Sequence, residues 1–365
     1  QNDRLYLPHE ITDLSLLPVN VPTGGWQTLS HNPDAVPVEV PGTVEEYLTV
    51  TDNPRPENFR GVSWWYRKIT IPADQQKKRF IIYFESVRMR AEVYLDGKLV
   101  AYDLIGETPF HVDITDEAKP GKEQLLAIRV TNPGGNFHWQ DFDIMKWGEY
   151  NIPPSRSFTG IIGRVKLESV NPVFISDIYM QNTPELTKVN AILSFTNETS
   201  SSVKQDVELI VNEKGNPDKV VFRQTLKAIS FPAGNHEVTI PVNVPDAKLW
   251  DLSTPELYTC NVLIKKGKKT LDQDKKDFGF RWFTVDGVGK DAVLRLNGRR
   301  IMLRSAISWG YFPVTGLIAT TEMAEKQVRT AKSLGLNMLN FHRCIGSPVV
   351  LEKADELGLL YYEEP

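Results

Sequence analysis

The sequence predicts a multidomain chain in which two β-sandwich domains precede the first βα units of a parallel sheet. From about residue 61 to 285, short runs of alternating apolar and polar residues are separated by Gly, Pro and Asn turns. This pattern is typical of β-sandwiches. After residue 286 the period changes, and a helix, a Gly stop and a buried strand occur twice in succession. Such a repeat is typical of βαβ units, which build parallel sheets.

Length and composition agree with a globular protein of two or three domains. The chain has 365 residues, of which 41% are hydrophobic, and a formal net charge of -4. The charges are scattered, so no basic surface for nucleic acid is expected. No apolar run approaches the roughly 18 residues that cross a membrane, and no targeting segment is recognisable. We therefore expect a soluble chain without nucleic-acid or membrane partners.

The sequence does not decide the cellular compartment of the protein. Gln1 is not an initiator Met, which fits a processed exported protein and a trimmed sequence equally well. A periplasmic or secreted location is favoured over a cytoplasmic one. Cys260 and Cys344 fall in different predicted domains, so we expect two free, mostly buried thiols rather than a disulfide.

The first predicted domain covers residues 1–170. The Asp96-Gly97 pair predicts a type I′ hairpin, because both central residues of that turn need positive φ. Trp64 and Trp65 are adjacent on a strand, so one of them should face the core. The clearest strands are residues 64–71, 79–84, 91–95 and 125–130.

The second predicted domain covers residues 171–285. Turns recur at about ten-residue spacing, as at residues 214–217 and 266–268. The length suits a seven-stranded immunoglobulin-like sandwich of about 100 residues. No Cys…Trp…Cys core is present, which excludes an antibody-type domain.

The third predicted domain covers residues 286–365 and begins with a strand at residues 300–304. Thr320 and Thr321 offer N-caps to a helix that should end at Gly335 and bury Ala324, Val328 and Ala331. A second helix has Ser347 as its expected cap and Pro348 at its first position, and Gly358 ends it. Its apolar stripe is Val350, Leu351, Ala354 and Leu357. Three strands and two helices are too few for an eight-stranded barrel of about 250 residues, so this domain should be incomplete within the chain.

Four segments occur in an order that resembles glycoside hydrolase family 2, the group of β-galactosidases, β-glucuronidases and β-mannosidases. The first is residues 61–68 (Gly-Val-Ser-Trp-Trp-Tyr-Arg-Lys), and the second is residues 84–87 (Phe-Glu-Ser-Val) with 91–98 (Ala-Glu-Val-Tyr-Leu-Asp-Gly-Lys). The third is residues 249–258 (Leu-Trp-Asp-Leu-Ser-Thr-Pro-Glu-Leu-Tyr) with 278–281 (Phe-Gly-Phe-Arg). The fourth is residues 296–304 (Leu-Asn-Gly-Arg-Arg-Ile-Met-Leu-Arg).

The resemblance implies a jelly-roll sugar-binding domain, an immunoglobulin-like domain and the opening of a (β/α)8 TIM barrel, in that order. It also implies a retaining exo-β-glycosidase that acts on a carbohydrate substrate. In the family the acid/base Glu follows an Asn after the fourth barrel strand, and the nucleophile Glu comes later. Both positions would lie beyond Pro365, so we expect no catalytic residue within this chain.

Two departures from the family argue against transferring galactose specificity. After the first barrel strand β-galactosidases typically read Arg-Gly-Val-Asn-Arg-His, whereas residues 304–309 read Arg-Ser-Ala-Ile-Ser-Trp. After the second strand they read Arg-x-Ser-His, whereas residues 340–343 read Asn-Phe-His-Arg. The sugar therefore stays open.

Glycosidic cleavage needs two carboxyl groups on either side of the bond, and Glu363-Glu364 is the obvious local pair. Consecutive strand residues point to opposite faces of a sheet, so both cannot address one sugar ring. Either residue could instead bind a sugar hydroxyl, with a buried ion pair in the barrel as the alternative.

The remaining candidates are substrate-positioning residues near the strand ends. Trp309 could offer a flat apolar face to a sugar, or it could close the barrel mouth or pack on the immunoglobulin-like domain. Asn340, His342 and Arg343 follow the second strand at its C-terminal end, where barrel enzymes carry their binding groups. The alternatives are a structural role for His342 and a salt bridge for Arg343.

By resemblance, the loop at residues 136–143 reaches toward the barrel mouth and contributes one acidic residue, Asp141 or Asp143, to the sugar site. The alternative is a loop stabilised by its own aromatic residues.

No cofactor is required by the sequence. The six His residues show no paired ligand spacing, no Cys pair has zinc spacing, and no Gly-rich phosphate loop follows a strand. Asn197-Glu198-Thr199 is a glycosylation acceptor only in a eukaryotic host, and chance is the better interpretation.

The rival hypothesis is a non-catalytic carbohydrate-binding or scaffold protein that ends naturally at Pro365. Its open third strand would leave backbone groups unpaired, which is an aggregation hazard. Homo-oligomerisation stays open under both hypotheses.

Overall fold

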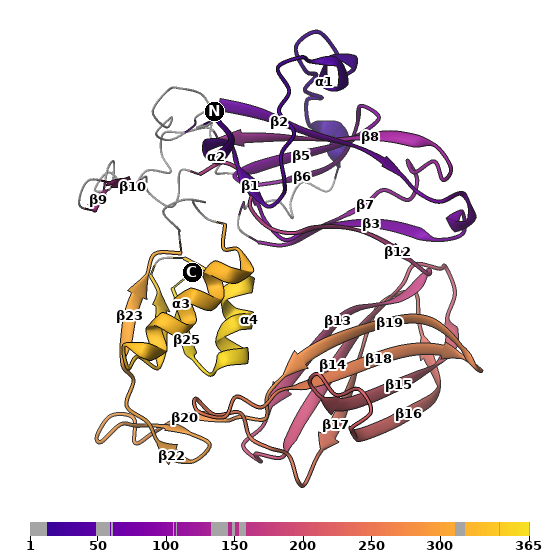
Figure 1. The fold of residues 1–365 in the computed structure, drawn as a ribbon. Helices are drawn as coiled ribbons and strands as arrows, with labels where there is room; N and C mark the ends of the chain where they lie inside the picture. The colour runs from indigo at the N-terminus through magenta and orange to yellow at the C-terminus, as the bar shows by residue number, and fades with distance from the viewer. Residues whose placement is uncertain are drawn as a thin grey trace. The chain divides into compact units, whose positions relative to one another are not determined.

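The computed structural model describes residues 13–48, 59, 61–104, 106, 108–132, 145–147, 150–152, 158–310, 318–342 and 344–364. The chain forms two compact units (Figure 1). The first consists of Gln1–Ser169 with Trp309–Ala319, and the second of Val170–Ser308 with Thr320–Pro365. No helix in the described part is long and apolar enough to cross a membrane.

The first unit is a β-sandwich. One sheet has the strand order β2 (Gly61–Thr70), β8 (Glu123–Asn132), β5 (Arg90–Leu95) and β6 (Lys98–Asp103). A second sheet has the order β12 (Val165–Val170), β3 (Arg79–Phe84) and β7 (Phe110–Asp113). Phe80, Ile82 and Phe84 of β3 pack against Val93 of β5 and Ile128 of β8 between the two sheets. The predicted strands at 64–71, 79–84, 91–95 and 125–130 are confirmed to within three residues at each end.

Shorter elements complete this unit. A small sheet orders β1 (Gly42–Thr43), β11 (Gly160–Ile161) and β4 (Val87–Arg88), and β9 (Met145–Trp147) pairs with β10 (Tyr150–Ile152). The helical segments are η3 (Leu14–Leu16), α1 (Gln27–His31), α2 (Val44–Leu48) and η4 (Ala73–Gln75).

The predicted hairpin at Asp96-Gly97 is confirmed. Both residues have positive φ, 49° and 84°, and Leu95 pairs with Lys98 across the turn. The Asp96 carboxylate also accepts hydrogen bonds from the Leu125 backbone N–H (2.9 Å) and from Lys119 Nζ (2.9 Å). Burial alone would raise the pKa of Asp96, but these hydrogen bonds and one from Gln124 hold it below its usual range.

The adjacent tryptophans lie on opposite faces of β2, as predicted. Trp65 is buried in the core between the sheets. Trp64 packs on the outer face with Tyr94 and with Trp26 from the N-terminal segment, at ring-centroid distances of 5.7 and 5.6 Å. Asn20 of the same segment donates to the buried Glu92 carboxylate at 2.7 Å. The N-terminal segment therefore covers a second, smaller apolar face of the sandwich.

Glu45 of α2 is a buried carboxylate that joins three parts of the first unit. Its side chain accepts hydrogen bonds from the backbone N–H groups of Thr159 (3.0 Å) and Phe59 (3.2 Å), and the residue is 6% exposed. Asn132 closes the cluster by donating to the Phe59 carbonyl at 2.7 Å. Burial raises the pKa of Glu45 to about 7, although these hydrogen bonds and the charge of Arg88 oppose the shift.

The pKa of Glu45 makes the stability of this unit depend on pH. Because the pKa in the folded chain lies above the ordinary value of 4.5, folding favours the protonated carboxyl. This contribution is complete below about pH 4.5 and is lost as the pH rises through 7, amounting to about 3 kcal/mol. We expect denaturant unfolding between pH 5 and 8 to show this loss in the wild type and not in Glu45→Gln.

The matched control is Glu123→Gln, which changes an exposed glutamate of β8 in the same sandwich. This variant should keep the wild-type pH dependence. An equal loss of stability in Glu45→Gln and the wild type would assign the titration to another group.

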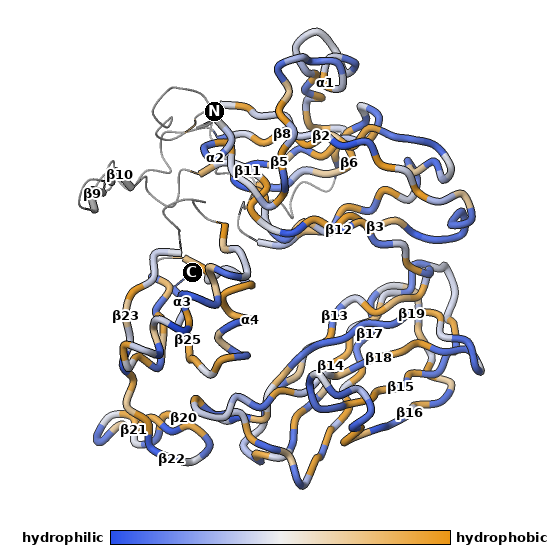
Figure 2. Tube along the Cα trace, viewed as in Figure 1, coloured by the Kyte–Doolittle hydropathy of each residue, from blue (hydrophilic) through white to orange (hydrophobic). Residues whose placement is uncertain are grey.

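The second unit begins with a seven-stranded sandwich, in a stretch that the structure describes throughout. One sheet orders β13 (Val173–Asn182), β14 (Lys188–Asn197) and β17 (Gly234–Asn243). The other orders β16 (Val220–Phe231), β15 (Val203–Glu213), β18 (Tyr258–Lys266) and β19 (Lys269–Phe278). Buried and partly exposed residues alternate along β18. Figure 2 shows apolar and polar stretches interspersed along the strands of this sandwich.

The structure bears on two sequence expectations, the glycosylation motif and the cysteines. Asn197 is 2% exposed, and its Nδ2 donates to the carbonyls of Ser201 and Phe231, each at 2.9 Å. The Asn197-Glu198-Thr199 motif therefore builds a loop and does not present a glycan acceptor in the folded chain. Cys260 and Cys344 form no disulfide, as predicted; Cys260 is buried, Cys344 is half-buried, and burial raises the pKa of the Cys260 thiol to about 12.

A short antiparallel sheet of β20 (Phe283–Asp286), β21 (Val293–Leu296) and β22 (Arg299–Arg300) follows the sandwich. The prediction of a strand at residues 300–304 is wrong, because the Asn297-Gly298 turn, with φ of 51° and 77°, returns Arg299 and Arg300 to β21. The first parallel strand is β23 (Ser305–Ser308). Asn337 sets this register by donating to the Met302 carbonyl (2.9 Å) and accepting from the Arg304 N–H (2.7 Å).

The chain then forms the predicted parallel sheet. Its order is β23, β24 (Met338–Phe341) and β25 (Leu360–Glu363), and α3 (Thr321–Ser333) and α4 (Pro348–Leu357) lie side by side on it (Figure 1). Thr320 caps α3 by accepting from the Met323 N–H at 3.2 Å. The expected cap at Ser347 is only partly right, because its side chain makes no cap hydrogen bond. The predicted buried faces are confirmed for Ala324, Val328, Ala331, Val350 and Ala354.

Candidate functional site

The C-terminal ends of the parallel strands are held together by backbone hydrogen bonds that continue past the ladder. His342 N–H donates to the Ser308 carbonyl at 2.9 Å, and Glu364 N–H donates to the Phe341 carbonyl at 3.2 Å. The residues just after β24 and β25 therefore have fixed backbone positions. This edge is where parallel βα folds carry their functional groups.

Two of the predicted site residues meet at this edge. His342 Nδ1 lies 2.9 Å from Glu364 Oε2, and the two side chains are 24% and 30% exposed. Glu363 instead accepts a hydrogen bond from the Gly346 N–H at 3.1 Å. The two adjacent carboxylates thus serve different partners, one a side chain and the other the loop between β24 and α4.

Asn340 lies on β24 in register with Ile307 of β23 and Tyr362 of β25. Residues in register on parallel strands point to the same face, so these three form one row. Ile307 and Tyr362 are each 56% exposed. Asn340 Oδ1 is buried and accepts no hydrogen bond from any residue that the structure describes. A buried amide oxygen without a donor costs about 1 to 3 kcal/mol, so this row favours an additional donor.

The other candidates are placed less fully. Trp309 follows Ser308 directly, is half-buried and groups with the first unit, whereas Asn340, His342, Glu363 and Glu364 belong to the second. Arg343, Asp141 and Asp143 lie outside the described residues.

One contact at this edge has no counterpart in the sequence analysis. Gln327 of α3 donates from Nε2 to Ser308 Oγ at 3.1 Å, so the helix anchors the end of β23 immediately before Trp309. A polar residue beside an apolar helical stripe is typical of an exposed position, and no sequence pattern distinguished it.

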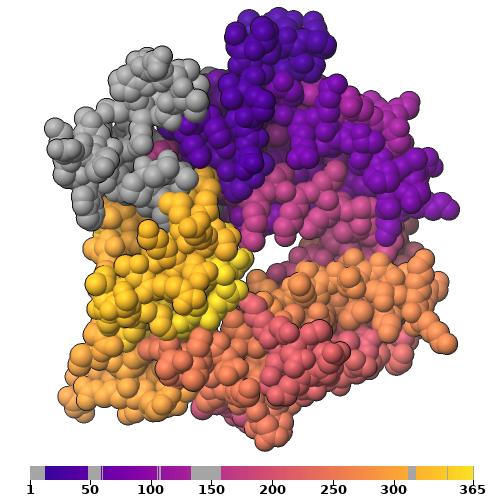
Figure 3. Space-filling view, in the orientation of Figure 1, coloured from indigo at the N-terminus to yellow at the C-terminus, as the bar shows by residue number. Residues whose placement is uncertain are grey.

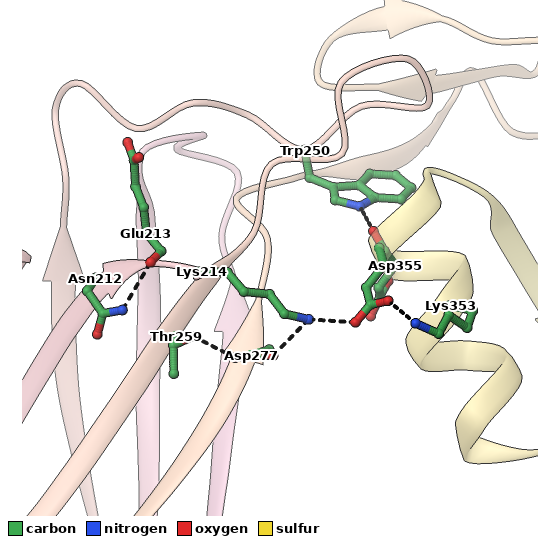
Figure 4. Close-up of polar contacts among 9 residues, drawn as sticks. Asn212, Glu213, Lys214, Trp250, Thr259, Asp277, Lys353 and Asp355 are labelled. Atoms are coloured by element: carbon green, nitrogen blue, oxygen red, sulfur yellow. Dashed lines mark hydrogen bonds and ion pairs between the residues drawn. The ribbon is translucent and has the colours of Figure 1, made fainter. Parts of the chain in front are cut away.

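We refer to the parallel sheet with α3 and α4 as the parallel module. At the N-terminal ends of its strands, the module is fixed to the sandwich through Trp250. This indole is fully buried and donates from Nε1 to the Asp355 carbonyl in the last turn of α4, at 2.7 Å (Figure 4). The Arg281 guanidinium lies over the Trp250 ring at 4.5 Å and donates to Asp355 Oδ1 at 2.7 Å. We refer to Trp250, Arg281 and Asp355 as the tryptophan junction.

Charged groups surround the tryptophan junction. Lys214 bridges Asp277 (3.0 Å) and Glu356 (2.9 Å), and Lys353 also binds Glu356. Burial alone would raise the pKa of Glu356, but the hydrogen bonds from Lys353 and Lys214 lower it overall. In the space-filling view (Figure 3), the C-terminal atoms drawn in yellow border the salmon and orange atoms of the sandwich.

Lys332 of α3 completes the attachment without a carboxylate partner. Its Nζ donates to the carbonyls of Leu252 (2.6 Å) and Gly358 (3.0 Å), and also to that of Leu357. The last two are at the C-terminal end of α4, where a cation interacts favourably with the helix dipole. All these contacts lie where the helices end and the strands begin. None of them occupies the C-terminal ends of the parallel strands, where the candidate residues lie.

A cleft of about 430 Å³ lies beside this region. It is lined by Lys248, Leu249, Asp251, Thr254, Glu256, Asn297 and Arg299. Arg299 pairs with Asp251, and none of the lining residues offers an aromatic face for a sugar. Among the described residues no three His, Cys, Asp or Glu side chains form a group that could hold a metal ion.

Two helix-ending glycines, Gly335 and Gly358, should respond differently to substitution, because only Gly358 lies close to another part of the backbone. Gly335 and Gly358 each end a helix with φ of 78°. A Cβ at Gly358 would lie 2.4 Å from the Leu252 carbonyl oxygen, whereas a Cβ at Gly335 would meet nothing within 4 Å. Gly335→Ala should cost about 1 to 2 kcal/mol from the left-handed backbone alone. Gly358→Ala should cost at least about 2 kcal/mol more, because the backbone contact cannot relax.

Urea unfolding of both variants measures this difference. Equal destabilisation would show that the close approach of Gly358 to Leu252 does not contribute to stability.

Comparison with known proteins identifies relatives of both β domains. Residues 19–152 match the family model described as glycosyl hydrolases family 2, sugar binding domain. Residues 173–281 match the model described as glycosyl hydrolases family 2. Together the two models cover more than half of the chain.

Curated relatives bear names from two activities. A putative beta-glucuronidase of Formosa agariphila is 27% identical over 99% of this chain and 40% of its own length. A beta-galactosidase of Thermoanaerobacterium thermosulfurigenes is 28% identical over 80% of this chain and 40% of its own length. The chain thus spans about two fifths of the length of these relatives.

Solved structures share the fold. The beta-glucuronidase of Bacteroides uniformis superimposes with a TM-score of 0.73 at 23% identity, covering 90% of this chain and 38% of that structure.

Proposed function

The chain belongs to glycosyl hydrolases family 2, and we propose that the protein containing it is a retaining exo-β-glycosidase that removes a terminal sugar from a carbohydrate substrate. The names of the relatives favour a β-glucuronide or a β-galactoside as substrate. The observation that carries the proposal is the strand edge with His342, Glu364 and the unsatisfied Asn340 in a chain of this family.

In this proposal the chain contributes three parts. Residues 1–170 form a jelly-roll sugar-binding domain, residues 171–285 an immunoglobulin-like sandwich, and residues 286–365 the opening of a (β/α)8 barrel. The parallel pairing of β23, β24 and β25 supports the last assignment, since βαβ repeats of this kind build such barrels. The tryptophan junction supports a scaffold role for the second domain, because its contacts are at the strand N-terminal side.

The two catalytic carboxyl groups are proposed to lie outside this chain. A retaining mechanism needs a nucleophile and an acid/base about 5 to 5.5 Å apart on either side of the glycosidic bond. Glu363 is bound to the Gly346 N–H and Glu364 to His342, which supports positioning roles for both.

The substrate-binding residues of the chain are then Trp309, Asn340, His342 and Arg343, with Asp141 or Asp143 from the first domain. Asn340 has the strongest physical support, because a sugar hydroxyl would supply the donor that its Oδ1 does not find among the described residues. Trp309 would offer a ring face to the C–H groups of the sugar.

A panel of p-nitrophenyl β-glycosides tests the proposed activity on the intact protein. We expect one member, the β-glucuronide or the β-galactoside first, to be hydrolysed with retention of anomeric configuration as followed by NMR. Inversion would contradict the retaining mechanism. Binding of the sugars without turnover of any glycoside would favour the carbohydrate-binding or scaffold protein.

Trp309 can be tested with the same substrate. Trp309→Ala should raise KM about tenfold, or about 1.4 kcal/mol of binding, with a smaller change in kcat. Trp309→Phe keeps an aromatic face and should recover most of the affinity. An unchanged KM in Trp309→Ala would exclude Trp309 from the sugar site.

A further inference from the structure

The His342 and Glu364 side chains leave each other little freedom. Their backbones are fixed by hydrogen bonds to Ser308 and Phe341, as described for the strand edge. The Nδ1–Oε2 distance of 2.9 Å then fixes the orientation of the imidazole relative to the carboxylate. Both side chains are about a quarter exposed, so they are partly shielded from water but still open to a ligand.

The parallel register explains why Glu364 is the carboxylate that reaches His342. Phe341 is in register with Glu363, so the next residue on each strand, His342 and Glu364, lies just beyond the ladder. Glu363 is directed to Gly346 in the loop that follows His342. The neighbouring strand thus supplies one carboxylate to the histidine and another to its loop.

The chemistry of a carboxylate at Nδ1 is specific. A carboxylate accepts a hydrogen bond from Nδ1, which keeps a proton on that nitrogen and directs Nε2 away from the carboxylate. Carboxylates orient histidines in this way in many functional sites, where the partner fixes both the tautomer and the ring plane. As a stabilising ion pair alone, a pair this exposed would contribute little.

We propose that Glu364 is a positioning residue of the sugar site, which orients His342 and fixes its proton on Nδ1 so that the imidazole contacts the bound sugar in one tautomer. This inference rests on the proposed glycosidase function. Glu364 acts only through His342 and does not itself contact the reacting atoms.

A double-mutant cycle on the intact protein tests whether Glu364 acts through His342. The substrate is the p-nitrophenyl β-glycoside that the wild type hydrolyses, and the variants are Glu364→Gln, His342→Asn and the two combined. Glu364→Gln should raise KM about tenfold with a smaller change in kcat, because the neutral amide can donate as well as accept and so no longer fixes the proton on Nδ1. In the His342→Asn background the same substitution should change KM less than twofold.

Two further variants separate positioning from stability. Glu364→Asp keeps a carboxylate on a shorter side chain and should recover part of the loss. Glu325→Gln changes an exposed glutamate of α3 that pairs with Arg329 and should leave KM unchanged. Thermal unfolding of each variant shows whether the fold is retained.

The outcomes are distinct. An equal rise in KM from Glu364→Gln in both backgrounds, or an unchanged KM in the wild-type background, would overturn the positioning role and leave the glycosidase function intact. No turnover of any glycoside by the wild type would overturn both.

Discussion

The hydrogen bond from the buried Trp250 indole to the Asp355 carbonyl is the constraint on which the second unit depends. A buried indole N–H needs an acceptor, and here the acceptor is in the last turn of α4. Gly358 follows three residues later and leads directly into β25. With so short a connection, fixing the end of the helix also fixes the start of the strand. Because β25 is hydrogen-bonded to β24 and β24 to β23, the positions of these two strands are fixed as well.

The two ends of the parallel module differ in how their polar groups are satisfied. At the sandwich side, Lys332 binds three carbonyls and Arg281 both stacks and pairs, so the described groups are well supplied with partners. At the other edge, Asn340 has a buried oxygen that accepts from no donor in the described part of the chain. Each such group in a native protein needs an explanation, and the one we propose for Asn340 is a bound sugar. The groups that support the fold and the proposed binding groups thus lie at opposite ends of the parallel strands.

Turns and helix caps could be predicted from the sequence, because they depend only on neighbouring residues. Asp96-Gly97 needs positive φ and forms its turn, and Thr320 caps α3 as its position indicates. The strand expected at residues 300–304 shows the limit of such predictions. Its apolar residues fit a strand, but the Asn297-Gly298 turn and the distant Asn337 amide decide the register.

In the candidate site, too, the residue types follow from the local sequence, whereas their partners depend on distant contacts. The residue types at the strand ends can be predicted, because parallel sheets present polar groups there. The partner of each residue depends on the register between strands and on contacts such as that of Gln327 with Ser308, which have no local signature.

The burial of Asn197 has a consequence for the order of events during biosynthesis. In a secretory compartment with oligosaccharyltransferase, glycan transfer to Asn197 would have to precede closure of the sandwich, since the folded amide is committed to Ser201 and Phe231. Each transfer would then prevent the loop from closing. The fraction of glycosylated chains would therefore depend on how quickly this sandwich folds relative to glycan transfer.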